Sequence, residues 1–375
     1  MDEKRLLIKR WFSIRKLDIL AMLVLVAVIG VVCPVLALPA LAFVCVITGI
    51  SHLIGKSKRH SVSRVVETIV GGMSDITSAA VIHSPYPLCL IDEKGQILEK
   101  DRIKTSAEDL DSFMQSVYQV ADQYQGQFDG IAVCAPGKID TENKVIYFGG
   151  ALEFLDGLNL QKTLGDKYSV PISVENDGKA AALSEQWLGE LRGVDTGVAI
   201  TLGTGVGGGV VVNNHILHGW TFQAGELSWM ITNSGIGVKN MAAYTGSSCS
   251  AVNMIKKVNL ALGNKDLDDG LAAFEAINNG DLRAMAIFTR YCRNVAIMII
   301  NIQTVINASK FVIGGGISNQ PILIEEINNQ LHKILDNNIM IHKQMIAPEV
   351  VAAGHGNDSN LYGALYALLL ELKEK

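Results

Sequence analysis

A glycine-rich segment in the middle of the chain has the composition of a phosphate-binding turn. The segment TLGTGVGGGVVVNN, residues 201–214, places its glycines directly after one apolar stretch and before another. Glycines let backbone N–H groups approach an anion without obstruction by a Cβ atom. The order strand, glycines, strand fits neither a Rossmann fingerprint nor a Walker A loop. Taken alone, the segment is as consistent with a structural hairpin turn as with a phosphate cradle.

An amide and a carboxylate stand next to each other at the end of another apolar stretch. In ENDGKAAALSEQWLG, Asn176 and Asp177 directly precede an alanine-rich helical pattern. Asp is a preferred N-cap residue, so a purely structural capping role is one interpretation. The other is catalytic, because a carboxylate at a strand end in a cleft can act as a general base toward an attacking hydroxyl.

Two further segments are weak signals by themselves. FQAGELSW carries Glu226, which in isolation would be an ordinary surface residue. FVIGGGIS places Gly314, Gly315 and Gly316 after a strand, where they could receive the adenosine side of a nucleotide or simply form a strand-to-helix turn. The order and spacing of all four segments make the functional interpretation worth pursuing.

The remaining sequence predicts an α/β architecture that can position these segments. Short apolar stretches alternate with amphipathic helical patterns, which is typical of α/β folds. The expected strands include 88–92, 97–103, 130–134, 144–150, 171–177, 198–202, 208–214 and 310–313, and the expected helices include 107–125, 160–168, 320–337 and the apolar C-terminal stretch, with several more between 234 and 307. Two such lobes would enclose a cleft, the usual location of a nucleotide.

The composition and charge of the chain exclude some classes of function. The chain has 375 residues, enough for two or three domains, and a net charge of −5. Its soluble part has no basic block, so no nucleic-acid partner is expected. The six cysteines form no CxxC pair and are typical of buried thiols in a reducing compartment.

The N-terminal part contains a long uncharged apolar run. Residues 19–50 carry no charged side chain, Pro34 and Pro39 interrupt the run, and basic residues flank both ends. A straight helix of this length would measure about 48 Å, longer than the hydrocarbon core of a bilayer. We therefore expect a hydrophobic helical hairpin that attaches the protein to a membrane through residues 19–55, with both ends in the cytoplasm. A re-entrant or interfacial hairpin and a buried soluble one remain alternatives.

Taken together, the motifs resemble the ROK family of sugar kinases and related repressors, from about Leu88 to the C-terminus. The family's glycine signature corresponds to LGTGVGGGVVVNNHILHGWTFQAGE. Its other elements correspond to PGKID, VPISVEND, GGGIS and NDSNLYGA. The resemblance implies two actin-like (ribonuclease H-like) α/β lobes.

The same resemblance implies roles for individual residues. Asp177 matches the catalytic base, and Asn176 and Glu226 match ligands of the sugar hydroxyls. We also assign substrate binding to Gly149 and Gly150. The expected nucleotide-binding residues are Gly203, Thr204, Gly205, Gly207 and Gly208 in the phosphate turn and Gly314, Gly315 and Gly316 on the adenosine side. ATP and Mg²⁺ are the implied cofactors, and a homodimer is compatible with the family.

Two departures from the family pattern matter. Trp229 stands where many members have a histidine, and Cys249 is the only cysteine in the region of their zinc cluster, so no zinc is expected. This places the chain closer to the zinc-free branch, which includes β-glucoside kinases. The family also opens with a DIGGT-like phosphate hairpin, whereas this chain reads AAVIHSPYP before LCLID. Asp75 and Thr77 are a possible but displaced substitute.

These observations lead to one leading hypothesis and two alternatives. The leading one is ATP-dependent phosphorylation of a hexose or hexoside hydroxyl at the cytoplasmic face of the cell membrane, impaired if the first phosphate hairpin is missing. The second is a catalytically weak or dead, membrane-attached sugar-binding protein. The third, a ROK repressor, would need an N-terminal helix-turn-helix. The expected organisation is a membrane segment over 1–60, a linker and helix over 61–87, an N-terminal lobe over 88–176 completed by 358–375, and a C-terminal lobe over 177–357.

Overall fold

The computed structural model describes residues 78–83, 88–101, 109–150 and 152–374. The chain divides into residues 1–77 and residues 78–375, and every described residue belongs to the second unit. The predicted hydrophobic hairpin and membrane segment lie outside the described residues. Within the described part, none of the helices combines the length and the apolar character that a membrane span requires.

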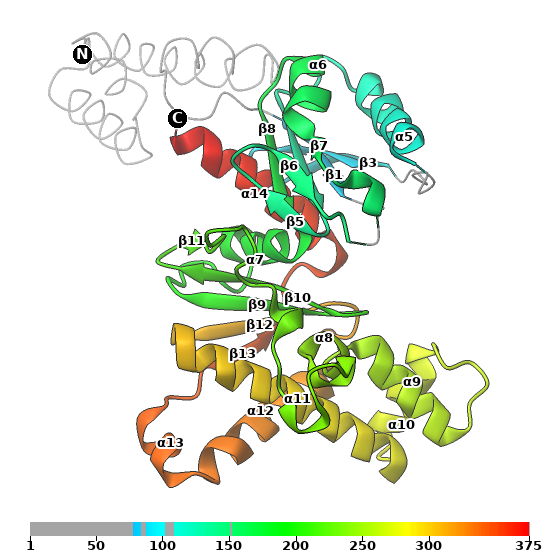
Figure 1. The fold of residues 1–375 in the computed structure, drawn as a ribbon, viewed down its shortest axis with the longest axis vertical. Helices are drawn as coiled ribbons and strands as arrows, with labels where there is room; N and C mark the ends of the chain where they lie inside the picture. The colour runs from blue at the N-terminus through cyan, green and yellow to red at the C-terminus, as the bar shows by residue number, and fades with distance from the viewer. Residues whose placement is uncertain (1–77, 84–87, 102–108, 151, 375) are drawn as a thin grey trace, which may run out of the picture. The chain divides into compact units, whose positions relative to one another are not determined.

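The first sheet has five strands in the order β3, β2, β1, β4, β8 (Figure 1). Strand β1 pairs antiparallel with β2 and parallel with β4, and β8 pairs parallel with β4. All six residues of β4 are buried, as expected of a parallel strand covered on both faces. The bounds are β1 Ser78–His83, β2 Leu88–Asp92, β3 Ile97–Asp101, β4 Gly130–Ala135 and β8 Ile172–Asn176. A small antiparallel sheet is formed by β5 Lys138–Asp140, β6 Val145–Tyr147 and β7 Leu158–Asn159.

The second sheet repeats the strand order of the first. Its order is β11, β10, β9, β12, β13, with β9 antiparallel to β10 and parallel to β12. The bounds are β9 Gly197–Leu202, β10 Val206–Val212, β11 His215–Ile216, β12 Lys310–Gly314 and β13 Glu349–Ala352. Strand β9 therefore corresponds to β1, and the turn at 203–205 corresponds to the β1–β2 connection at 84–87.

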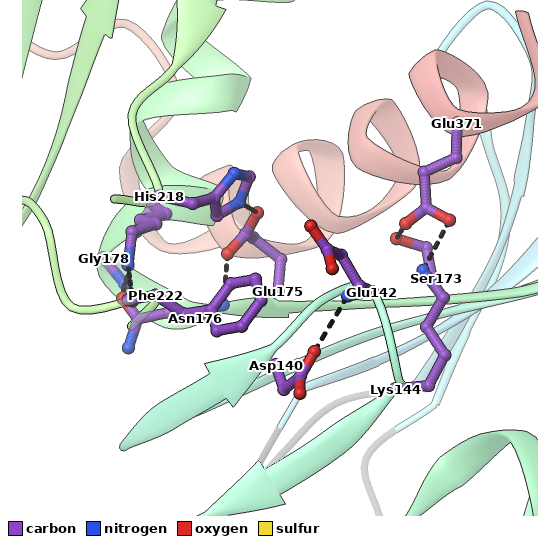
Figure 2. Close-up of polar contacts among 11 residues, drawn as sticks. Asp140, Glu142, Lys144, Ser173, Glu175, Asn176, Gly178, His218, Phe222 and Glu371 are labelled. Atoms are coloured by element: carbon purple, nitrogen blue, oxygen red, sulfur yellow. Dashed lines mark hydrogen bonds and ion pairs between the residues drawn. The ribbon is translucent and has the colours of Figure 1, made fainter. Parts of the chain in front are cut away.

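Two helices connect the sheets. Helix α7 (Asp177–Leu188) packs against β9 and β10, α14 (Ser359–Glu374) packs against β1, β4 and β8, and the two helices pack against each other (Figure 1). Figure 2 shows how the end of α14 is held on the first sheet. Glu371 accepts a hydrogen bond of 2.8 Å from the Ser173 hydroxyl and pairs with Lys144 at 2.5 Å.

The other helices build the cores on the outer sides of the sheets. Helix α5 (Leu110–Gln123) begins after Asp109, whose side chain accepts from the Ser112 amide at 2.7 Å, and buries its apolar face in the core of the first sheet. The core of the second sheet gathers side chains of β9, β12 and helices α9, α11 and α12. The bounds are α6 Asp166–Tyr168, α8 Thr245–Ser248, α9 Ala251–Leu262, α10 Gly270–Asn278, α11 Leu282–Ile306, α12 Pro321–Asp336 and α13 Ile339–Gln344.

One expectation about the domain start needs correction. The range 61–87 was expected to contain a linker and a helix, but β1 lies within it, so the first sheet includes residues from Ser78 onward rather than from Leu88. Pairing on both sides, with β2 and with β4, stabilises this segment as a strand. Such long-range pairing leaves little trace in a short local pattern.

Candidate active site

Asn176 and Asp177 take different positions at the start of α7. Asn176 is the N-cap: its side-chain oxygen accepts from the amides of Gly178 at 3.0 Å and Lys179 at 3.2 Å (Figure 2). The Asn176 amide group also donates to the Gly137 carbonyl at 3.0 Å. Asp177 is the first residue inside the helix and accepts from the Gly178 amide at 2.8 Å. Because Asn176 provides the cap, capping does not explain why position 177 is an aspartate.

Glycines bring the first turn of α7 close to strand β10. A Cβ atom at Gly178 would lie 2.6 Å from the Gly208 nitrogen, and one at Gly209 would lie 2.5 Å from the Ala182 Cβ. Strand β10 contains Gly207 and Gly208, which the sequence pattern assigned to the phosphate turn. Gly208 serves the close packing of helix on strand, whereas Gly207 is partly exposed and has only ordinary contacts.

The loop between β9 and β10 is the part of the glycine segment that is open to a ligand. It contains Gly203, Thr204 and Gly205, and the Gly203 amide donates to the Gly205 carbonyl at 3.0 Å. A Cβ atom at Gly203 would meet no protein atom within 4 Å, so the backbone there is accessible. The Gly203 carbonyl accepts from the Ala251 amide at 2.9 Å, which anchors the loop to the start of α9.

Glu226 lies beside the same strand. It precedes a short 3₁₀ helix, Leu227–Trp229, and its carboxylate accepts a hydrogen bond from the Ser228 hydroxyl. Leu227 packs so closely on β10 that a Cβ atom at Gly208 would lie 2.6 Å from a methyl group of Leu227. The structure therefore brings the segment of Glu226, the start of α7 and the glycines of β10 together.

A buried charged network, which the sequence analysis missed, lies behind these residues. Glu175, at the end of β8, is 2% exposed, and its carboxylate pairs with His218 Nε2 at 2.7 Å (Figure 2). Lys179 is 4% exposed and donates to the Phe222 carbonyl at 2.8 Å. One signal was visible in the sequence: a lysine two residues after Asp177 interrupts an otherwise small and apolar helix face.

Gly137 lies between Asn176 and the loop of Gly149 and Gly150, the two glycines assigned to substrate binding. Gly137 has φ +96° and packs directly against the Phe148 and Gly149 backbone, leaving no room for a side chain. A Cβ atom at Gly150 would lie 3.2 Å from Pro136. Since the Gly137 carbonyl accepts from Asn176, this loop and the start of α7 are neighbours.

The glycine turn at residues 314–316 borders a cavity of about 250 Å³. Thr201, Gly314, Gly315 and residues of α7 and of the start of α14 line this cavity, whereas Asp177 and Glu226 do not. Gly315 has φ +100° and packs on the backbone of Leu202, directly before the 203–205 loop. A Cβ atom at Gly316 would meet no protein atom within 4 Å. The two glycine turns therefore adjoin each other at one end of the second sheet.

The counterpart of the phosphate turn in the first sheet has a different composition. Strand β1 reads SAAVIH and the connection to β2 reads SPYP, so neither provides a glycine or an aspartate. In the zinc region, Trp229 is 69% exposed and Cys249 is buried. The described residues contain no group of three or more His, Cys, Asp or Glu side chains that could hold a metal ion. The expected absence of zinc stays a prediction.

Comparison with known proteins agrees with the motifs. The family model described as "ROK family" matches residues 85–371. A β-glucoside kinase of Listeria monocytogenes serovar 1/2a is 28% identical over 244 residues, which cover 64% of this chain and 80% of that protein. A glucokinase of Halalkalibacterium halodurans is 30% identical over 250 residues, covering 60% of this chain and 74% of that protein.

The fold of the chain also agrees with that of a solved ROK family protein. A solved ROK family protein from Streptococcus pneumoniae TIGR4, in complex with sucrose, superimposes with a TM-score of 0.71 at 26% identity and covers 80% of this chain and 100% of that one. The predicted α/β fold and the predicted family are thus confirmed. This chain belongs to the ROK family.

Proposed function

We propose that this protein is an ATP-dependent sugar kinase that phosphorylates a hydroxyl of a hexose or hexoside. The observation that carries the proposal is the convergence of Asp177, Glu226 and the glycines of β10 at the start of α7. Two of the relatives named above are a β-glucoside kinase and a glucokinase, in agreement with the predicted enzyme class.

Each residue has a role that its position supports. Asp177 accepts the proton of the attacking hydroxyl, because its carboxylate can act as a general base. Its position is compatible with this role, since Asn176 and not Asp177 provides the N-cap of α7. Asn176, Glu226 and the Gly149–Gly150 loop bind the other sugar hydroxyls. Carboxylate and amide groups suit this task, since each hydroxyl both donates and accepts hydrogen bonds.

The open backbone around Gly203 and Gly316 fits a nucleotide. Loop 203–205, with Gly207 beside it, would hold phosphate oxygens, and Gly314 to Gly316 would hold the adenosine side. Bound ATP supplies the phosphoryl group, and Mg²⁺ neutralises part of its charge. The protein's contribution is to orient the hydroxyl toward this position and to remove its proton through Asp177.

The proposal predicts sugar-dependent turnover. The full-length protein, assayed with ATP, Mg²⁺ and a panel of hexoses and β-glucosides, should release ADP with at least one sugar well above the sugar-free rate. ADP release coupled to NADH oxidation measures this. Absence of turnover with every sugar would contradict the proposal.

A second candidate function, a catalytically weak or dead sugar-binding protein, rests on the composition of β1 and its connection to β2. The family hairpin at that place supplies an aspartate and glycines, and this chain has neither there. Phosphoryl transfer depends on positioning and charge stabilisation, so loss of one of two phosphate turns would slow it strongly. Saturable sugar binding by calorimetry, without ADP release, would favour this candidate over the first.

Attachment to the cytoplasmic face of the membrane through residues 19–55 is also part of the proposal, and homodimer formation is compatible with it. The support is the uncharged run and its basic flanks in the sequence. The full-length protein should sediment with membranes after lysis without detergent and resist a high-salt wash. Recovery in the soluble fraction would contradict attachment.

A further inference from the structure

Lys179 is a buried cation at the site whose presence the proposed roles do not yet explain. It is the third residue of α7, and only 4% of it is exposed. Lysine is rarely buried to this degree without partners, because removing an ammonium group from water is costly. Its contacts should therefore reveal what it stabilises.

The contact of the Lys179 ammonium links two separate parts of the site. Its Nζ atom donates to the Phe222 carbonyl at 2.8 Å. Phe222 has φ +61°, an uncommon conformation for a non-glycine residue, and it lies four residues before Glu226. The hydrogen bond thus ties the segment that carries Glu226 to the helix that carries Asp177.

Three carboxylates act electrostatically on this ammonium group. Burial lowers the pKa of Lys179, and the carboxylates of Glu175, Glu226 and Asp177 oppose that shift, in this order. They come from β8, from the segment before the 3₁₀ helix, and from α7. His218 faces Glu175 at 2.7 Å. The Cys134 thiol of β4 also faces this cluster: burial and then the charges of Asp177 and Glu175 raise the pKa of Cys134.

We propose that Lys179 is a positioning residue of the sugar site: its buried ammonium group, through the Phe222 carbonyl, holds the segment that carries Glu226 against the helix that carries Asp177. This inference rests on the proposed function, because it assigns Glu226 to sugar binding and Asp177 to proton acceptance.

Loss of the Lys179 ammonium group should weaken sugar binding more than the chemical step. The Phe222 carbonyl would lose its donor, and Glu226 would no longer be fixed relative to Asp177. A lysine that only filled space would leave the KM for the sugar unchanged. Replacement by methionine retains most of the side-chain volume and removes the charge.

The test compares Lys179→Met and Lys179→Arg with the wild-type full-length protein, and uses Lys256→Met as the matched control. Lys256 is a half-exposed lysine of α9 that pairs with Asp268 at 3.3 Å. For Lys179→Met we expect kcat/KM for the sugar to fall by about 100-fold, mostly through a higher KM, with weaker calorimetric sugar binding. Lys179→Arg keeps a donor for the Phe222 carbonyl and should recover part of the lost sugar affinity, and Lys256→Met should match the wild type.

The outcomes separate the two proposals. Wild-type kinetics and wild-type sugar affinity in folded Lys179→Met would overturn the inference while leaving the kinase proposal intact. If Lys179→Met does not fold, Lys179→Arg decides, since a loss of sugar affinity of about 100-fold or more despite the retained donor would overturn the inference. If the wild-type protein neither phosphorylates nor binds any sugar, the proposed function fails and the inference fails with it. If it binds sugar without turnover, the calorimetric affinities provide the same comparison.

Discussion

Asp177→Asn should lower kcat for sugar phosphorylation by about 10²- to 10⁴-fold, the usual contribution of a general base. The amide cannot accept the hydroxyl proton, yet it preserves the size of the side chain. The helix should form as before, because its cap is the neighbouring Asn176. Sugar affinity should therefore change much less than turnover.

A matched aspartate gives the control for this experiment. Asp269 is the N-cap of α10 and accepts from the Ala272 amide at 3.0 Å. Asn caps helices about as well as Asp, so Asp269→Asn should match the wild type in both stability and turnover. Steady-state ADP release and isothermal calorimetry measure the two quantities. If Asp177→Asn keeps more than a tenth of the wild-type kcat, Asp177 is not the base.

Gly363→Ala should destabilise the fold by about 3 kcal/mol, at the upper end of the usual cost of overpacking. A Cβ atom at Gly363 would overlap the carbonyl group of Ala180 and lie 2.7 Å from the Ala180 Cα. All of these are backbone atoms of α7, so no side-chain rotation can relieve the overlap. The two helices would have to separate, and α7 carries both Asp177 and Lys179.

Urea unfolding followed by circular dichroism measures this effect, and Gly270→Ala is the control. Gly270 is the first residue of α10, and a Cβ atom there would lie 3.5 Å from Ile255, an ordinary contact. Alanine is the better helix former, so this substitution should leave the midpoint unchanged or raise it. A wild-type midpoint for Gly363→Ala would show that the close crossing of α14 and α7 is not required for stability.

Much of the architecture was visible in local patterns. The turn DEKGQ between two apolar stretches predicted the β2–β3 hairpin, and the helical period of 107–125 predicted α5. The motifs from LGTGVGGG to NDSNLYGA predicted the family, which the comparisons confirm. The N-terminal apolar run lies outside the described residues, so its predicted membrane hairpin stays a prediction.

The predicted site residues come together only through long-range packing. Asp177 and Glu226 are distant in the sequence, and the sequence pattern alone did not show that Gly208 and Gly209 make room for α7 or that Gly363 makes room for Ala180. Nor did it show which member of the Asn176–Asp177 pair caps the helix, because both residue types are good caps.

The amino-acid sequence predicted most of the strands and helices, the family and a set of candidate residues, because periodicity and turn composition depend on near neighbours. Packing decided the placement of β1, the division of the glycines between an open loop and a packed strand, and the burial of Lys179 against the segment that carries Glu226. These features depend on contacts between segments far apart in the chain. The free energy of such contacts comes from burial and close approach, which no single segment encodes.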